Sequence, residues 1–189
     1  DSDRLWSHFA AVHPDFRRQG IGEGLKRFQR EWALEQGYQR MNWTFDPLQS
    51  ANANFNFRRL GVTAHTYHVN FYGEMQDALN AGMQSDRLQV LWDFSTRTTG
   101  KAGSTDAPFA LVYSAGKPEI GVTPENEPIR VAIPRHFNAI KAQDLGLARE
   151  WQLALRQVFL DALAKNYAIV AFDRGPDSGY YTLSTRSLA

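Results

Sequence analysis

The segment Val12-His13-Pro14-Asp15-Phe16-Arg17-Arg18-Gln19-Gly20-Ile21-Gly22-Glu23-Gly24-Leu25 predicts how the chain folds on either side of it. An apolar run precedes it, glycine occupies every second position from 20 to 24, and a helical pattern follows. A helix N-terminus presents free backbone amides and the positive end of the helix dipole, and glycines let an anion approach the main chain closely. Basic side chains outnumber acidic ones around this turn. The segment therefore predicts a phosphate-binding turn at the start of a helix.

Apolar periodicity predicts the elements that flank this turn. The spacing of Ile21, Leu25, Phe28 and Trp32 marks one face of a helix, and Gly37 is placed to end it. Strands are expected at Leu5–Val12, Met41–Phe45, Val62–Tyr72 and Leu88–Phe94, and helices at Gly20–Gln36, Ser50–Leu60 and Glu74–Ala81. This alternation of strands and helices predicts an α/β arrangement for the first half of the chain.

The composition changes after Phe94. Residues Ser95–Pro108 are rich in Thr, Gly and Ser and predict a linker or long loop, followed by an α+β extension. In the extension, strands are expected at Phe109–Ser114, Ile129–Ile133, Tyr167–Phe172 and Tyr180–Leu183, a loop at Ala115–Glu127, and a helix whose apolar stripe runs from Leu147 to Ala162. The expected organisation is thus a core at 1–94, a linker at 95–108 and an extension at 109–189.

Composition excludes several classes of protein. The 189 residues hold 43% hydrophobic side chains, enough for a real core, and no cysteine, so disulfides and thiolate chemistry are ruled out. A formal net charge of +1 lacks the basic excess of a nucleic-acid binder. No apolar run is long enough to span a bilayer, and no metal site is expected because His65 and His68 point to opposite faces of a strand. We expect a soluble cytoplasmic protein.

The residues alone exclude one ligand-binding interpretation of the glycine turn and leave three interpretations open. A P-loop is excluded because no Gly-x4-Gly-Lys-Ser/Thr string occurs. A dinucleotide fingerprint lacks its third glycine, where Leu25 stands, although Asp46 lies about where a ribose-binding acid belongs. A glycine-containing helix start without a ligand is a further reading. The last interpretation, also of a ligand-binding turn, rests on a resemblance to a known family.

The run Arg17-Arg18-Gln19-Gly20-Ile21-Gly22 resembles the Arg/Gln-x-x-Gly-x-Gly/Ala signature of the GNAT N-acetyltransferase superfamily. Further stretches, including Trp43–Leu48, Leu60-Gly61, Asn70–Gly73 and the helix around Trp151, resemble one bacterial branch of it that has a C-terminal extension. The resemblance implies a mixed α/β sheet that binds acetyl-CoA or another acyl-CoA between two splayed strands. It also implies direct attack of an amine on the thioester.

The resemblance implies the following site residues. Those expected to bind the acyl-CoA are Val12, Arg17, Arg18, Gln19, Gly20, Ile21, Gly22, Glu23, Asn52 and Asn56. The usual catalytic acid is a tyrosine four residues before the Gly that ends the second helix, but Phe57 stands there. Tyr67 and Tyr72 are the replacement candidates for the acid, and His8 and Asp46 are the candidate bases.

Three further expectations concern the whole protein. Three strands usually precede the phosphate turn in this superfamily, so the sequence resembles the C-terminal part of a longer fold that lacks its usual N-terminal strands. The expected function is N-acyl transfer to a small-molecule amine; a catalytically silent CoA-binding or interaction module is the alternative. The stripe between Leu147 and Ala162 packs either on the sheet or against a second copy, so that a homo-oligomer is one expectation.

Overall fold

A single mixed sheet runs through the chain in the computed structural model, which describes residues 3–8, 10–16, 19–73, 82–96, 103, 106–124 and 127–185. Nine strands build it in the order β1-β2-β4-β3-β8-β9-β7-β5-β6. The strands are β1 (Arg4–Trp6), β2 (Arg40–Phe45), β3 (Thr63–His68), β4 (Arg87–Asp93), β5 (Phe109–Ser114), β6 (Lys117–Ile120), β7 (Ile129–Pro134), β8 (Tyr167–Arg174) and β9 (Ser178–Thr185). The fold is therefore mixed α/β, as the sequence predicts.

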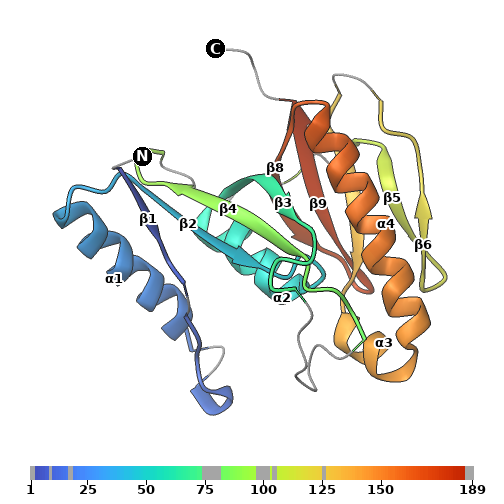
Figure 1. Cartoon of the computed structure of the whole chain (residues 1–189), viewed down its shortest axis with the longest axis horizontal. Helices are drawn as coiled ribbons and strands as arrows, with labels where there is room; N and C mark the ends of the chain where they lie inside the picture. Colours follow the sequence, from blue (N-terminus) through green and yellow to red (C-terminus); the bar gives the residue numbers. More distant parts are fainter. Residues whose placement is uncertain are drawn as a thin grey trace.

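The sheet joins the two halves of the chain. Strand β3 pairs with β8 in an antiparallel ladder that places Ala64 opposite Ile169. Only the pairs β1–β2 and β5–β7 are parallel; the other neighbours in the described sheet are antiparallel. Strands of the predicted core and of the predicted extension thus share one hydrogen-bonded sheet. Figure 1 shows β1 and β2 toward one end of it and β5 and β6 toward the other.

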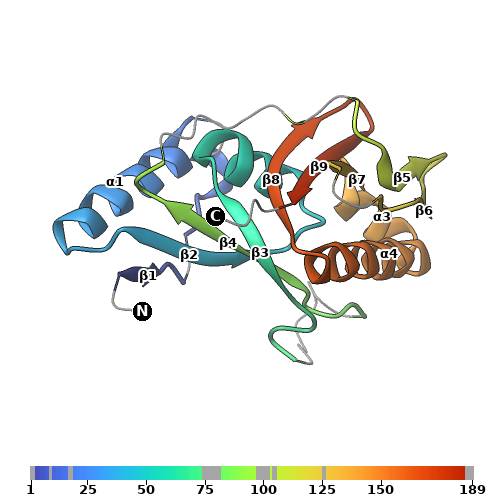
Figure 2. The ribbon, with the colours of Figure 1, turned by 90° about the horizontal axis from the view of Figure 1, so that it is seen from above.

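Helices cover the sheet at different places. The α-helices are α1 (Ile21–Glu35), α2 (Ser50–Ala53), α3 (Phe137–Gln143) and α4 (Leu145–Ala164), and a π-helical turn, η2 (Asn54–Leu60), continues α2. A short 3-10 turn, η1 (Pro14–Phe16), precedes α1. Viewed from above in Figure 2, α1 and α4 lie at opposite ends of the molecule. Within the described ranges, no helix has both the length and the apolar character needed to cross a membrane.

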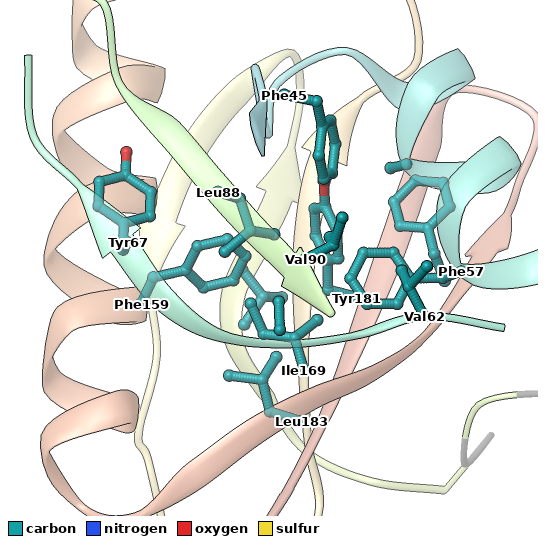
Figure 3. Packing of buried hydrophobic residues seen from close by; sticks show 14 of the residues in the cluster. Phe45, Phe57, Val62, Tyr67, Leu88, Val90, Phe159, Ile169, Tyr181 and Leu183 are labelled. Atoms are coloured by element: carbon teal, nitrogen blue, oxygen red, sulfur yellow. The ribbon is translucent and has the colours of Figure 1, made fainter. Parts of the chain in front are cut away.

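The main core lies where the two halves meet. Tyr181 of β9 packs edge-on against Phe57 of η2 and Phe159 of α4, with ring centroids 5.7 and 5.2 Å apart. Phe159 also contacts Tyr67 of β3. Figure 3 shows these rings packed together from β3, β9, η2 and α4. Because each aromatic side chain buries a large apolar surface, this cluster holds the C-terminal half on the rest of the sheet.

The apolar stripe of α4 faces this core. Trp151, Leu155 and Phe159 are fully buried, and the Trp151 ring stacks on Tyr113 of β5. The stripe therefore serves the chain's own core, the first of its two expected roles. Self-association through residues 109–189 stays a prediction.

Helix α1 buries a different face from the one its periodicity indicates. Its apolar residues Ile21, Leu25, Phe28 and Trp32 are 40%, 46%, 70% and 45% exposed among the described residues. The buried residues of α1 are Lys26 and Ala33. Periodicity thus gave the correct helix and the wrong buried face.

Several element boundaries also differ from the predictions. The strand expected at Leu5–Val12 ends at Trp6, because its continuation leaves the sheet. The expected loop at Ala115–Glu127 contains β6, which pairs with β5 through a tight turn whose residues Ala115 and Gly116 have positive φ. Pro118 concealed this strand, and it is tolerated because β6 is an edge strand.

Helix α3 was not predicted at all. The helix expected at Glu74–Ala81 lies outside the described residues, as does most of the expected linker between 97 and 105.

Candidate functional site

A gap between β1 and β2 forms the centre of the site. The parallel ladder covers only Arg4–Trp6, and its last bond runs from the Ser7 amide to the Asn42 carbonyl at 2.8 Å. Beyond that bond the chain of residues 10–12 lines one wall of a cavity of about 240 Å³, and Trp43–Phe45 of β2 line the other. Two strands that stop pairing leave backbone groups and space for an extended ligand between them.

The N-terminus of α1 presents backbone donors that have no acceptor among the described residues. Gly20 adopts a left-handed conformation with φ of 80°, and no side chain caps the helix. The first helical bond joins the Gly24 amide to the Gly20 carbonyl at 3.0 Å. Among the described residues, none accepts a hydrogen bond from the amides of Ile21, Gly22 or Glu23. Three amides and the helix dipole are therefore directed at the same position, which suits a phosphate group.

The gap and the helix N-terminus belong to one groove. The cavity at the gap and the cavity in front of Gly20–Glu23 share a set of lining residues: Ala10, Val12, Gly22, Asn52 and Phe55. At Gly22 a Cβ would lie 3.7 Å from a Val12 methyl and 3.9 Å from the Phe55 ring. The groove is thus narrow where it passes the second glycine of the turn. It leads from the N-terminus of α1 to the gap between β1 and β2.

Lys26 lies at the gap end of this groove. Its side chain is 5% exposed, and its Nζ donates to Ser7 Oγ at 2.9 Å and to Gln29 Oε1 at 3.2 Å. The same Nζ lies 3.9 Å from the centre of the Trp43 ring. Burial lowers the pKa of Lys26 from 10.5 to about 8, because the charged form loses hydration there.

The sequence interpretation did not single out Lys26 as a site residue. The available signal was its place on the helical row Gly22, Lys26, Gln29 and Ala33, which is the row that faces the sheet.

Helix α2 and the π-helical turn supply the opposite wall. Asn52 and Asn56 both line the groove, and the Trp43 indole donates to Asn56 Oδ1 at 3.2 Å. Phe57, at the position of the usual tyrosine, instead lies in the core and is 1% exposed. π-Helical turns inside helices occur often at functional sites, since they shift which side chains face a ligand.

The four candidate catalytic residues fall into two groups. His8 and Tyr72 are exposed side chains that line the cavity at the gap. Tyr67 is buried, its hydroxyl donates to Asp86 at 2.6 Å, and burial together with the Asp86 charge raises its pKa. Asp46 lines a separate cavity beyond the end of β2. The geometry thus brings Tyr72 and His8 to the groove and favours Tyr72 over Tyr67 as an acid.

The remaining residues that are predicted to bind the acyl-CoA are placed as follows. Val12, Gly20, Ile21, Gly22 and Glu23 line the groove at its phosphate end. Gln19 is exposed, and its side-chain amide donates to the Asp15 carbonyl at 3.2 Å. Arg17 and Arg18 lie outside the described residues. Within the described part of the chain, no group of three His, Asp or Glu side chains is arranged for a metal ion. That these residues bind an acyl-CoA stays a prediction.

A comparison with protein-family models identifies the segment that builds this groove. The model of the acetyltransferase (GNAT) family matches residues 1–62, from before β1 to the end of the π-helical turn. The match confirms the resemblance drawn from the glycine turn. Among curated proteins, no match to the chain is found.

Proposed function

We propose, from the match of residues 1–62 to the model of the acetyltransferase (GNAT) family, that this protein transfers an acyl group from acyl-CoA to an amine. Acetyl-CoA is the simplest donor. The observation that supports the proposal most directly is the groove that joins the N-terminus of α1, whose first amides have no acceptor among the described residues, to the gap between β1 and β2. Its two ends match a diphosphate and a short acyl chain.

The donor is proposed to lie along this groove. The amides of Ile21, Gly22 and Glu23 hold the diphosphate, as anions are held at other helix N-termini. Asn52 and Asn56 offer side-chain amides to the pantetheine arm, which carries amide groups of its own. The thioester then reaches the cavity bounded by Lys26, Trp43 and Tyr72.

Chemistry at that end is proposed to be direct transfer. The amine nitrogen attacks the thioester carbonyl, the new C–N bond forms, and the C–S bond breaks to release CoA. Positive charge on the buried Lys26 stabilises the negative charge that develops on the carbonyl oxygen and the sulfur. Tyr72 is the acid for the leaving thiolate, and His8 is one of the candidate bases.

Two glycines with the same geometry provide the test. Gly20 and Gly37 flank α1, have φ of 80° and 86°, and have no atom within 4 Å of an added Cβ. A tryptophan therefore strains the backbone about equally at both positions, but only at Gly20 does it enter the groove. Calorimetric titration with acetyl-CoA should show binding to the wild type and Gly37→Trp, and a loss of at least about 100-fold in Gly20→Trp.

Other outcomes are equally informative. Equal dissociation constants for Gly20→Trp and Gly37→Trp would contradict the proposed diphosphate site. Acetyl-CoA binding without thiol release on any amine would favour the silent CoA-binding module instead.

A further inference from the structure

The Lys26 amino group lies at the point where β1 and β2 part. Its Nζ donates to Oγ of Ser7, the residue whose amide makes the last bond between these two strands. The same Nζ lies 3.9 Å from the centre of the Trp43 ring, and Ser7, Lys26 and Trp43 all line the cavity at the gap. The thioester of the proposed donor is placed in this cavity. An amino group of the chain itself therefore lies beside the proposed electrophile.

The polar neighbours of Nζ suit a neutral amine as well as an ammonium group. Nζ donates to Ser7 Oγ and to Gln29 Oε1, and the Ser7 hydroxyl itself donates to Gln29 Oε1 at 3.0 Å. A neutral amine has two N–H groups and one lone pair, so it can keep both of these bonds. Because the Ser7 hydrogen is directed at Gln29, neither neighbour uses the lone pair. Attack on a carbonyl requires that lone pair.

The surroundings of Lys26 also favour the neutral form. In the part of the chain that the structure describes, no carboxylate forms an ion pair with Nζ. With a pKa of about 8, about 50% of Lys26 is neutral at pH 8, against about 0.3% of a lysine at 10.5. An acyl-CoA in the groove would therefore meet a free amine about 100-fold more often at Lys26 than at an exposed lysine.

We propose that the protein acylates itself at Lys26. The inference rests on the proposed acyl-CoA donor site. The neutral Nζ attacks the thioester carbonyl and a C–N bond forms, while the C–S bond breaks and its electron pair leaves with the sulfur. The attacking nitrogen gives up one of its two protons to the thiolate. The products are acyl-lysine at position 26 and free CoA.

Acylation of Lys26 should stop transfer to other amines. An amide nitrogen has one N–H and no positive charge, so acylated Lys26 keeps at most one of its two hydrogen bonds and cannot stabilise developing negative charge. The acyl group also fills part of the cavity of about 240 Å³ that the acyl end of the donor is proposed to occupy. Because an amide is far less reactive than a thioester, the modified lysine is an end product. Acyl-CoA should therefore inactivate the protein when acceptor amine is absent.

Mass spectrometry of the protein incubated with acetyl-CoA and without amine tests the proposal. The wild type should gain one acetyl group at Lys26 and release one equivalent of thiol. The initial rate at Lys26 should be at least about 100-fold the rate at Lys165, the exposed residue that ends α4. Gly20→Trp should slow acetylation of Lys26 at least about tenfold and leave Lys165 unchanged, because chemical acetylation of a surface lysine does not need the diphosphate site. Gly37→Trp should match the wild type at both lysines.

A second measurement follows the loss of activity. Thiol release with phenethylamine, ethanolamine or L-lysine is measured after preincubation with acetyl-CoA, and the rate should fall in proportion to the fraction of Lys26 that is acetylated. Lys26→Arg has no amine to acylate, so its rate should not decline during the same preincubation. A wild-type rate that stays constant while Lys26 becomes acetylated would overturn the inactivation.

The outcomes separate this inference from the proposed function. Thiol release with an added amine, together with an unmodified Lys26 after incubation without amine, would overturn self-acylation and leave acyl transfer standing. Equal acetylation of Lys26 in Gly20→Trp and Gly37→Trp would indicate a chemical reaction only and would also overturn it. Acetylation that depends on Gly20, without thiol release on any amine, would support the inference and contradict transfer to small amines. A failure to bind acetyl-CoA would overturn both.

Discussion

Lys26→Met should change how the stability of the protein depends on pH. Folding buries the Lys26 ammonium, and the pKa falls from 10.5 in the unfolded chain to about 8 in the folded one. Between these values the unfolded state still holds a proton that the folded state has released. The free energy of unfolding therefore rises as the pH increases from 8 to 10.5, and the cost of burying the charge is fully present below pH 8.

The size of this effect follows from the two pKa values. They correspond to about 3 kcal/mol of stability, gained between pH 7 and pH 11. Methionine removes the charge and two hydrogen bonds worth about 1 kcal/mol each. At pH 11 the Lys26 amine is neutral and makes no cation–π contact, so the wild type should be more stable than Lys26→Met by about 2 kcal/mol, the worth of the two hydrogen bonds. At pH 7 the cost of the buried charge outweighs these bonds, and Lys26→Met should be the more stable protein by about 1 kcal/mol.

Urea unfolding of both proteins at intervals between pH 7 and pH 11 measures this difference. Subtracting the two free energies removes the titration of groups that the proteins share. Ser7, Gln29 and Trp43, which contact Nζ, do not titrate in this range. Lys165→Met is the control, because its exposed lysine should give a difference that is independent of pH. A pH-independent difference for Lys26→Met as well would refute a desolvated ammonium in the groove.

Two further substitutions test the catalytic assignments. Tyr72→Phe should lower kcat for thiol release about tenfold without changing the dissociation constant for acetyl-CoA. This loss of kcat should shrink above pH 8.5, where a thiolate leaves unprotonated. A loss of kcat that is constant with pH argues against Tyr72 as the acid. Phe57→Tyr introduces the tyrosine that the resemblance implies, but its hydroxyl would enter the core between Phe45 and Tyr181. Urea unfolding should therefore show a free energy of unfolding that is lower by about 1–3 kcal/mol, and kcat should not rise. A higher kcat would show that position 57 faces the groove.

Local patterns in the sequence predicted the part of the fold that builds the donor groove. The helix after Gly20, the strand at Met41–Phe45 and the helix that ends at Gly61 are all present with nearly the expected bounds. These elements depend on turn residues and short-range periodicity, which a single sequence contains. Within the described residues, the amides of the glycine turn have no acceptor, and their role in binding a phosphate stays a prediction.

The exposed face of α1 shows where such patterns stop being informative. The spacing of Leu25, Phe28 and Trp32 predicts a helix correctly, but periodicity does not say which element is available to cover that face. The sheet instead receives the row that contains Lys26. A lysine in a predicted helix looks like a solvated residue until the strand beneath it is placed. This is why the most unusual side chain of the groove was not identified from the sequence.

The cavity beyond the end of β2 was unpredictable for a different reason, since its parts are far apart in the sequence. Asp46 and Gln49 follow β2, Asp86 and Arg87 precede β4, and Lys141 belongs to a helix that the sequence did not reveal. The pairing of β2 with β4 brings Asp46 next to Arg87, and the pairing of β3 with β8, with the contacts of α3 and α4, adds the C-terminal segment. Long-range strand pairing leaves no local signal in a single chain.

The C-terminal half also holds the turn that follows β2, a strand that lines the groove. Sequence alone offered residues 109–189 a packing role, on the sheet or against a second copy, but no chemical one. In the fold, α3 fixes the turn after β2 through Asn138 and Gln49, and α4 neutralises Asp86 through Arg156. Without the first contact, Asp46 would lose part of its orientation, and without the second, the buried Asp86 carboxylate would lose its cation. The extension therefore does more than cover the sheet, because it fixes polar side chains at the end of β2 and before the start of β4.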